Sequence, residues 1–345
     1  MSSHQSHSSV PKFGLKYGMA QVSPTVPERM RAIAIDRFGG PEVLTMHTLL
    51  VPVPGASEVL IAVHTAEVGG WDADVRGGWS MSGKKPRFPL VLGGGGSGRV
   101  AAVGSRVRRF KTGDPVYSYA WDNPKGGFYA EYVAAPAETA ALVPAPLDLA
   151  QAGAIPIAAL TAIQGIDEAL HLKKGERLII LGASGGLGVF AIQFAKLRGA
   201  RVLAIASGAD GVALARKLGA DAAIDGRDGD ITGAARAFAR DGVDAILALT
   251  GGKALTKCLD TLRRGGRLAY PNGIEPVPKK RRGIRTKPYD GIAGRAQWER
   301  LSRAITAARL QVPIAAEFAL AEAARAHERL AQGHILGKVV LRISQ

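Results

Sequence analysis

The residues that most constrain this fold are 177–207, RLIILGASGGLGVFAIQFAKLRGARVLAIAS. Apolar runs at 178–181 and 202–206 predict two buried strands, and between them lie clustered glycines and a helical pattern that Gly199 ends. Glycines permit a tight turn and let backbone amides approach a phosphate, and a helix N-terminus favours an anion. The order strand, glycine turn, helix, strand therefore predicts a dinucleotide-binding unit, with a purely structural turn as the alternative.

Composition narrows the class of protein. The 345 residues suggest about two domains. No run of about 18 apolar residues occurs, so we expect no membrane span. The one cysteine, Cys258, can form neither an internal disulfide nor a cysteine-based metal site, and we expect a cytoplasmic protein. A net charge of +16 attracts polyanions and phosphorylated ligands, although a generally basic surface is the simpler interpretation.

The pattern of elements divides the chain. Residues 1–28 are rich in Ser, His and Pro and predict a flexible N-terminal extension. Short strands separated by Gly and Pro turns follow up to about residue 155, which is typical of a compact β-barrel. Beyond it, helical patterns alternate with strands at 178–181, 202–206, 222–224, 244–249 and 267–270, which predicts a doubly wound α/β domain. We assign residues 29–155 with 288–345 to a catalytic domain and 156–287 to a dinucleotide-binding domain. Within the C-terminal part we expect helices at 296–308 and 320–331 and a last strand at 338–343.

Five segments resemble one known family. They are residues 38–44, 110–116, 159–162, 182–188, and 326–330 together with 337–341. Together they resemble the medium-chain dehydrogenase/reductases, and specifically the zinc-independent, zeta-crystallin-like quinone oxidoreductases, over roughly residues 30–343. The resemblance implies a GroES-like β-barrel, a Rossmann domain with a doubly wound parallel sheet, and a homodimer. It also implies hydride transfer from NADPH to a quinone or an α,β-unsaturated acceptor.

The positions that match zinc ligands hold glycine. Zinc alcohol dehydrogenases of this superfamily carry a Cys and a Gly-His-Glu segment, and the matching residues here are Gly69, Gly94 and Gly95. A catalytic zinc needs three protein ligands that offer N, S or O, and glycine side chains offer none. We therefore expect no zinc in the manner of these relatives.

The resemblance also implies the residues that hold the cofactor. The six residues of the G-x-G-x-x-G pattern, with alanine at the first position, and the glycine before them are expected at the pyrophosphate: Gly182, Ala183, Ser184, Gly185, Gly186, Leu187 and Gly188. Further contacts are expected from Thr161, Thr250, Gly251, Asn272, Gly273 and Lys338. Ordinary roles remain open for several of these, such as a helix cap for Thr161 or a turn for Asn272.

The choice between NADPH and NADH depends on the end of the strand at 202–206. An NAD site usually places an acid there, on the ribose hydroxyls. Here no acid occurs before Asp210, Ser207 could bond a 2′-phosphate, and Arg227 matches a position near that phosphate in relatives. These features favour NADPH, although the basic and tyrosine partners of relatives appear here as Gly211 and Gly226.

The acceptor side is less defined. Gly69 stands where relatives carry an asparagine, and Trp71, Tyr117 and Trp121 could line an apolar pocket with Gly69, unless they serve only packing. No general acid stands out; Asp74 and Tyr289 are weak candidates.

Three functions stay open at this point. The first is an NADPH-dependent, metal-independent reductase of quinones or activated C=C or C=O bonds. The second is an enoyl-thioester reductase, for which the basic segment 279–287, KKRRGIRTK, could bind an acidic substrate. The third is a basic NADPH-binding protein with an RNA-binding or sensory role. A solvated linker is the simplest interpretation of that segment, because it lacks the aromatic residues that stack on bases.

Overall fold

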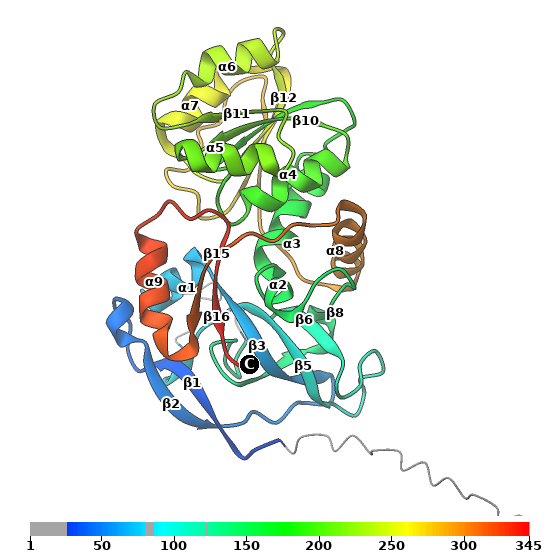
Figure 1. Ribbon diagram of the computed structural model, residues 1–345, viewed down its shortest axis with the longest axis vertical. Coiled ribbons are helices and arrows are strands. Elements are labelled where there is room, and N and C mark those ends of the chain that lie inside the picture. Colours follow the sequence, from blue (N-terminus) through cyan, green and yellow to red (C-terminus); the bar gives the residue numbers. More distant parts are fainter. Residues whose placement is uncertain (1–25, 80–85, 122, 345) are drawn as a thin grey trace, which may run out of the picture.

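The structure is a computed structural model that describes residues 26–79, 86–121 and 123–344. Its upper half in Figure 1 is built on a six-stranded sheet in which every neighbouring pair is parallel, in the order β11-β10-β9-β12-β13-β14. This is the doubly wound order, with the first strand, β9, in the middle. The strands are β9 (Arg177–Leu181), β10 (Arg201–Ala206), β11 (Ala222–Asp225), β12 (Val243–Ala248), β13 (Leu262–Pro271) and β14 (Arg285–Tyr289).

Helices cover both faces of this sheet. They are α3 (Pro156–Gln164), α4 (Gly188–Leu197), α5 (Gly208–Lys217), α6 (Ile231–Phe238), α7 (Gly252–Leu259) and α8 (Arg295–Ala308). Alternate residues of β9 separate into two cores, because side chains of a strand point to opposite faces. Leu178 and Ile180 pack with α3 and α4, whereas Ile179 and Leu181 pack with α6 and α7 and with the buried Cys258. The Rossmann-type fold predicted from the sequence is confirmed.

One strand of this sheet was not predicted. The basic segment 279–287 is not a loop throughout, because Arg285–Tyr289 forms β14, which pairs with β13 from Arg267↔Arg285 to Pro271↔Tyr289. The charged and proline-containing sequence RTKPY hides the strand, yet an edge position tolerates both features. The expected domain boundary at residue 287 therefore falls inside β14; the division into domains otherwise stays a prediction.

The lower half of Figure 1 is a barrel domain whose strands pair antiparallel, except that β15 and β16 are parallel. One sheet has the order β15-β16-β3-β5-β6-β8 with β7 paired to β3, and a smaller sheet has the order β2-β1-β4. The strands are β1 (Arg29–Ile35), β2 (Thr45–Leu50), β3 (Glu58–Val68), β4 (Leu90–Val91), β5 (Gly95–Val103), β6 (Pro115–Tyr119), β7 (Tyr132–Pro136), β8 (Ala140–Leu142), β15 (Ile314–Ala319) and β16 (Lys338–Arg342). The helices here are α1 (Gly70–Arg76), α2 (Leu149–Gly153) and α9 (Ala323–Ala331). The C-terminal strand β16 thus returns the chain to the barrel, as the resemblance implies.

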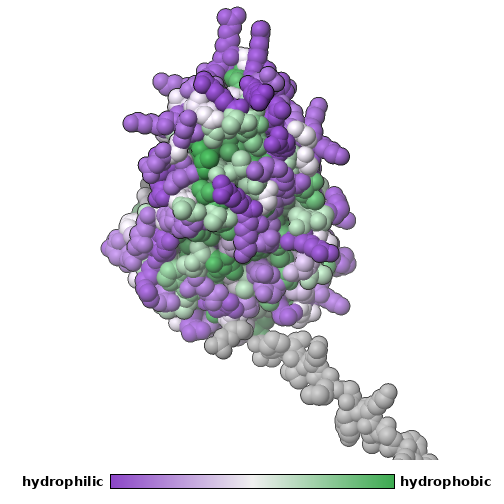
Figure 2. Space-filling model, turned by 45° about the horizontal axis from the view of Figure 1, so that its top comes forward, coloured by the Kyte–Doolittle hydropathy of each residue, from purple (hydrophilic) through white to green (hydrophobic). Residues whose placement is uncertain are grey.

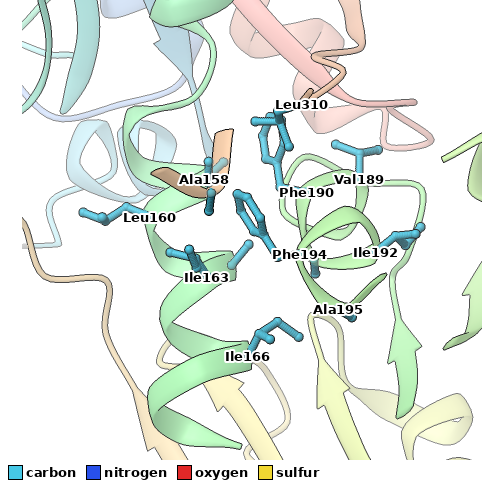
Figure 3. Close-up of a cluster of buried hydrophobic side chains, with 14 of the residues drawn as sticks. Ala158, Leu160, Ile163, Ile166, Val189, Phe190, Ile192, Phe194, Ala195 and Leu310 are labelled. Carbon is cyan, nitrogen blue, oxygen red and sulfur yellow. The ribbon is translucent and has the colours of Figure 1, made fainter. Parts of the chain in front are cut away.

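The two helices that follow the barrel and the glycine turn share one core. In Figure 3, Phe194 of α4 points toward Ala158 and Ile163 of α3, and Phe190 lies beside Leu310. Helix α3 starts with Pro156, which is favourable at the first helical position. Helix α8 adds the fully buried Trp298 to the same cluster. This core fixes the glycine turn relative to the barrel, because α3 begins at the barrel and α4 begins at the turn.

Within the described residues, no helix combines the length and apolar character that crossing a bilayer requires.

Truncating this shared core should destabilise the protein. Phe194 is 1% exposed, so we expect Phe194→Ala to lower the free energy of unfolding by about 3–5 kcal/mol through the cavity it leaves. Leu50→Ala is the control, because Leu50 on β2 is 62% exposed and should cost about 0.5 kcal/mol or less. Guanidinium unfolding of both variants measures the difference. Equal losses would contradict the assignment of Phe194 to a packed core.

Candidate functional site

The glycine turn is shaped by close backbone approaches. Gly182 follows β9 with φ +83°, a conformation that glycine adopts readily, and its N–H and that of Ala183 both donate to the Ile205 carbonyl at 3.0 Å. A Cβ atom on Gly188 would lie 2.3 Å from the Gly182 carbonyl oxygen, so α4 can begin against the turn only with glycine there. A Cβ on Gly185, in contrast, would meet only that oxygen, at 3.5 Å. The turn therefore combines one glycine needed for packing with one that leaves open space for a ligand.

Lys338 of the barrel lies over this turn. A Cβ on Gly186 would be 3.3 Å from Lys338 Cδ and 3.6 Å from its Nζ, and the Gly337 N–H donates to the Ser184 carbonyl at 3.0 Å. Lys338 is only 6% exposed and its Nζ lies 2.8 Å from Glu67 Oε2, a carboxylate that is 1% exposed. An ammonium beside the N-terminus of α4 fits an anionic pyrophosphate.

The end of β10 gathers both predicted 2′-phosphate residues. Gly208, next to Ser207, has φ +77°, and a Cβ there would lie 2.8 Å from an Arg227 guanidinium nitrogen and 3.0 Å from His334 Cε1. The guanidinium is paired with Asp225 at 3.0 Å and holds the pKa of that carboxyl well below its usual range. His334 Nε2 lies 3.0 Å from Asp210. His334 was not predicted, because it reaches this place from the segment after α9, far along the sequence.

The carboxyl ends of β12 and β13 bring further candidates together. A Cβ on Gly182 would lie 3.2 Å from Thr250 Cγ2, so Thr250 borders the glycine turn. Gly251 is held by a close approach to the Glu275 carbonyl, 2.4 Å from a Cβ placed on it. The Asn272 amide donates to Asp290 at 2.7 Å. Thr250 and Gly251 thus lie along the same sheet edge as the turn, where doubly wound sheets bind ligands.

Two candidates link this edge to the barrel. Gly273 has φ +88°, and a Cβ there would lie 3.1 Å from the Trp71 ring. Thr161 lies on α3, is 6% exposed, and its Oγ1 would be 2.2 Å from a Cβ on Gly291. Thr161 is therefore covered by the segment before α8, and Trp71 is the predicted acceptor-side residue that touches a predicted cofactor-side residue.

Three tryptophans form a cluster at this junction. The ring centroids of Trp71 and Trp79 are 4.9 Å apart, those of Trp71 and Trp121 5.9 Å, and those of Trp79 and Trp121 6.3 Å. A Cβ on Gly94 would lie 2.6 Å from the Trp121 ring, so the glycine makes room for the indole. Trp79, which was not among the predicted site residues, is 41% exposed. The cluster offers apolar aromatic surface beside Gly69 and Gly94.

Other sequence candidates lie elsewhere. Tyr117 is fully buried, its hydroxyl lies 3.1 Å from Ser302 Oγ, and its ring packs edge-on against Trp298 at 4.8 Å. It therefore belongs to the α8 core and cannot line a pocket. Tyr289 is 8% exposed, and its hydroxyl, without a hydrogen-bond partner among the described residues, lies against α3. Asp74 is an exposed residue of α1.

Carboxylates and indole occupy the region that matches a zinc site. A Cβ on Gly95 would lie 2.7 Å from Glu67 Oε1, and one on Gly69 would lie 3.7 Å from Asp72 Oδ2. In the described part of the chain, no group of three or more His, Cys, Asp or Glu side chains is arranged to hold a metal ion. The expectation that no zinc binds stays a prediction.

The groups that surround the glycine turn fit a dinucleotide. This site combines an open glycine turn, a free helix N-terminus, and a buried ammonium over that turn, and it faces a junction between two domains. A barrel joined to a doubly wound sheet in this way defines a nicotinamide-dependent oxidoreductase of the alcohol dehydrogenase type.

Known proteins agree with this class. The alcohol dehydrogenase GroES-like domain matches residues 55–146, and the zinc-binding dehydrogenase family matches residues 218–341. A quinone oxidoreductase of Sus scrofa is 31% identical over 325 residues, which cover 90% of this chain and 97% of that protein. A structure described as an NAD-dependent alcohol dehydrogenase has a TM-score of 0.84 at 30% identity and covers 91% of this chain and 100% of its own. A mycobacterial protein complexed with NADPH has a TM-score of 0.80 at 28% identity, with the same coverage.

The chain therefore belongs to the medium-chain dehydrogenase/reductase family, and quinone oxidoreductases are among its relatives. The family predicted from the sequence motifs is confirmed, as is an oxidoreductase.

Two alanine substitutions should separate packing from binding in the glycine turn. Gly188→Ala would overlap the Gly182 and Ala183 carbonyl groups, and we expect it to lower stability by about 2 kcal/mol or more. Gly185→Ala should fold normally but weaken dinucleotide binding about tenfold or more, because its Cβ would project into the open space of the turn. Thermal unfolding and fluorescence titration with NADPH measure the two effects. Unchanged binding by Gly185→Ala would show that the pyrophosphate lies elsewhere.

Proposed function

We propose that this protein is an NADPH-dependent, metal-independent reductase that transfers hydride to a quinone or to an activated C=C or C=O acceptor. The observation that carries the proposal is the juxtaposition of the glycine turn and Lys338 with a tryptophan cluster, in a region whose zinc-ligand positions are Gly69, Gly94 and Gly95. A bound nicotinamide cofactor would supply the hydride itself. The chain's own part is to orient both reactants and to exclude water.

The residues at the end of β10 support NADPH. Arg227 and the half-buried Ser207 offer a guanidinium and a hydroxyl for the 2′-phosphate of NADPH. Asp225 already pairs with Arg227, and Asp210 pairs with His334. A phosphate would compete with Asp225 for the Arg227 guanidinium, whereas the ribose hydroxyls of NADH would not need that cation.

The tryptophans support a planar, apolar acceptor. Indole faces stack favourably on aromatic rings, and an aromatic pair contributes about 0.5–1.5 kcal/mol beyond area burial. Trp71 connects the cluster to Gly273, so an acceptor on Trp71 would lie beside residues that we propose to hold the cofactor. Quinones and conjugated carbonyls need no strong Lewis acid, which agrees with glycine at the ligand positions.

A second candidate substrate is an acidic thioester. Figure 2 shows many hydrophilic side chains on the face that includes the dinucleotide-binding domain. In the segment after Gly273, Lys279, Lys280 and Arg282 are exposed, and no ion pair involves them within the described residues. Such cations favour the phosphates of a coenzyme A thioester over a neutral quinone.

A substrate panel tests the proposal. Purified protein is given NADPH with quinones, alkenals and enoyl-coenzyme A esters, and the loss of NADPH absorbance is followed with metal content measured on the same sample. Turnover of quinones or alkenals without stoichiometric metal is expected. Preference for the thioesters would favour the second candidate, and activity that requires zinc would overturn the metal-independent mechanism. Light scattering on the same sample tests the predicted homodimer.

Removing the Arg227 guanidinium should change cofactor preference. We expect Arg227→Ala to weaken NADPH binding about tenfold and to leave NADH binding nearly unchanged, because only NADPH presents a 2′-phosphate. Lys217→Ala, at the far end of α5, is the control for a lost surface charge. Dissociation constants measured at one ionic strength decide the result. Wild-type protein that binds NADH more tightly than NADPH would contradict the proposed cofactor.

A further inference from the structure

A buried carboxylate joins the two segments where zinc relatives carry metal ligands. Asp72, on α1, is 2% exposed. Its Oδ2 accepts a hydrogen bond from the Gly69 N–H at 2.8 Å, and the backbone amide of Gly94 also stabilises the carboxylate. Gly69 is the N-cap of α1 and Gly94 precedes β5, so the Asp72 side chain links two backbone segments that are far apart in the sequence.

A chain of hydrogen bonds ends on this carboxylate. Arg76 Nη1 lies 2.7 Å from His327 Nδ1, and since arginine can only donate, that ring nitrogen must accept. His327 therefore carries its proton on Nε2 and donates to the Tyr129 hydroxyl at 3.1 Å. That leaves the Tyr129 proton free for the Asp72 carboxylate, to which Tyr129 is hydrogen-bonded.

Burial of His327 also determines which groups donate and which accept in this series of hydrogen bonds. Burial and, to a smaller extent, the Arg76 guanidinium lower the pKa of His327 to about 4. The imidazole is thus neutral at physiological pH and keeps one proton, on Nε2. The Tyr129 hydroxyl and the Gly69 amide thus both donate to Asp72, which favours the ionised carboxylate because it can only accept.

The charged groups around Asp72 come from several elements. Glu67 on β3 is a second buried carboxylate and repels it, whereas Lys338 on β16 attracts it. Tyr119 on β6 also lies within its field. Burial is the largest influence and raises the pKa of Asp72 to about 6, against the amides of Gly69 and Gly94.

The raised pKa of Asp72 means that the folded protein is less stable at neutral pH, where this carboxyl is ionised. The folded-state pKa is raised above the ordinary carboxyl value of 3.8, so ionising Asp72 lowers stability as pH rises from about 4 to about 6, and the loss persists above that range. A carboxylate that serves packing alone would be replaced to advantage by a neutral residue. A function for the ionised form explains its presence better.

We propose that the ionised Asp72 is a positioning residue, which holds the Gly69 and Gly94 segments in the arrangement that cofactor and acceptor require. Protonation would remove the negative charge on which the hydrogen bonds from Gly69, Gly94 and Tyr129 converge, and would so weaken the link between the two segments. The inference rests on the proposed function for what lies opposite Gly69, but the hydrogen-bonded arrangement itself can be tested without catalysis.

The first test uses the protein without cofactor. Trp71 is the neighbour of Asp72 in the chain, so tryptophan emission should change with a midpoint near pH 6 in the wild type. Asp72→Asn should abolish this transition, and Tyr129→Phe should move its midpoint to higher pH because the carboxylate loses a donor. Asp36→Asn, an exposed carboxylate at the end of β1, and Tyr132→Phe, a half-buried tyrosine of β7, should leave it unchanged. A wild-type transition that persists in Asp72→Asn overturns the inference.

The second test uses turnover and stability together. Asparagine resembles the protonated acid, so Asp72→Asn should reduce kcat/KM about tenfold at pH 8 and progressively less toward pH 5. The ratio of variant to wild type is used because titration of the 2′-phosphate affects both equally. Melting temperature at pH 8 should be unchanged or raised. A ratio that is constant with pH, or a melting temperature that falls in parallel with activity, overturns the positioning role.

The two failures can be told apart. If no acceptor is reduced, the proposed function fails, while the emission transition and NADPH affinity of the same variants still test Asp72. If turnover is found but the variants titrate like the wild type, only the inference about Asp72 fails. Should Asp72→Asn not fold, Tyr129→Phe alone decides, through the predicted upward shift of the midpoint.

Discussion

The buried ion pair between Glu67 and Lys338 is the interaction on which the arrangement of the site depends. Its two members come from β3 and β16, and Lys338 lies over the glycine turn while Glu67 Oε1 accepts from the Ile157 N–H of α3 at 2.6 Å. Two charges this deeply buried are expensive unless each is fully bonded. The pair therefore constrains barrel, turn and α3 at once, because moving any of them would strand a charge.

Glycine at the zinc-ligand positions has physical consequences beyond the loss of ligands. The space is filled by Trp121 over Gly94 and by Glu67 against Gly95, so both glycines are now needed for packing. Where a metal would join the segments by coordination, backbone amides converge on Asp72 instead. The two segments are thus still joined by a polar group, but through hydrogen bonds whose strength depends on the protonation of Asp72.

The sequence predicted elements with strong local signals and missed those defined only by contacts. The glycine turn, β9 and β10 were predicted because an apolar run, a Gly cluster and a helical period coincide within 31 residues. Strand β14 was missed, because its residues carry charge and proline. Tyr117 was predicted to line a pocket but lies in the core, because the sequence pattern around an aromatic residue is the same in both places. Glu67 offered a usable signal, as a charge in an apolar strand. His327 and Tyr129 offered none, since 198 residues separate them.

The buried Cys258 has a bearing on the durability of such an enzyme. It is the only cysteine of the chain, is fully buried on α7, and burial raises the pKa of its thiol to about 12. Quinones and conjugated carbonyls add covalently to thiolates, and almost no thiolate forms here at neutral pH. A protein that handles such electrophiles would thus present no ready thiolate to them, and the addition that is fastest for a cysteine would be suppressed at its one thiol.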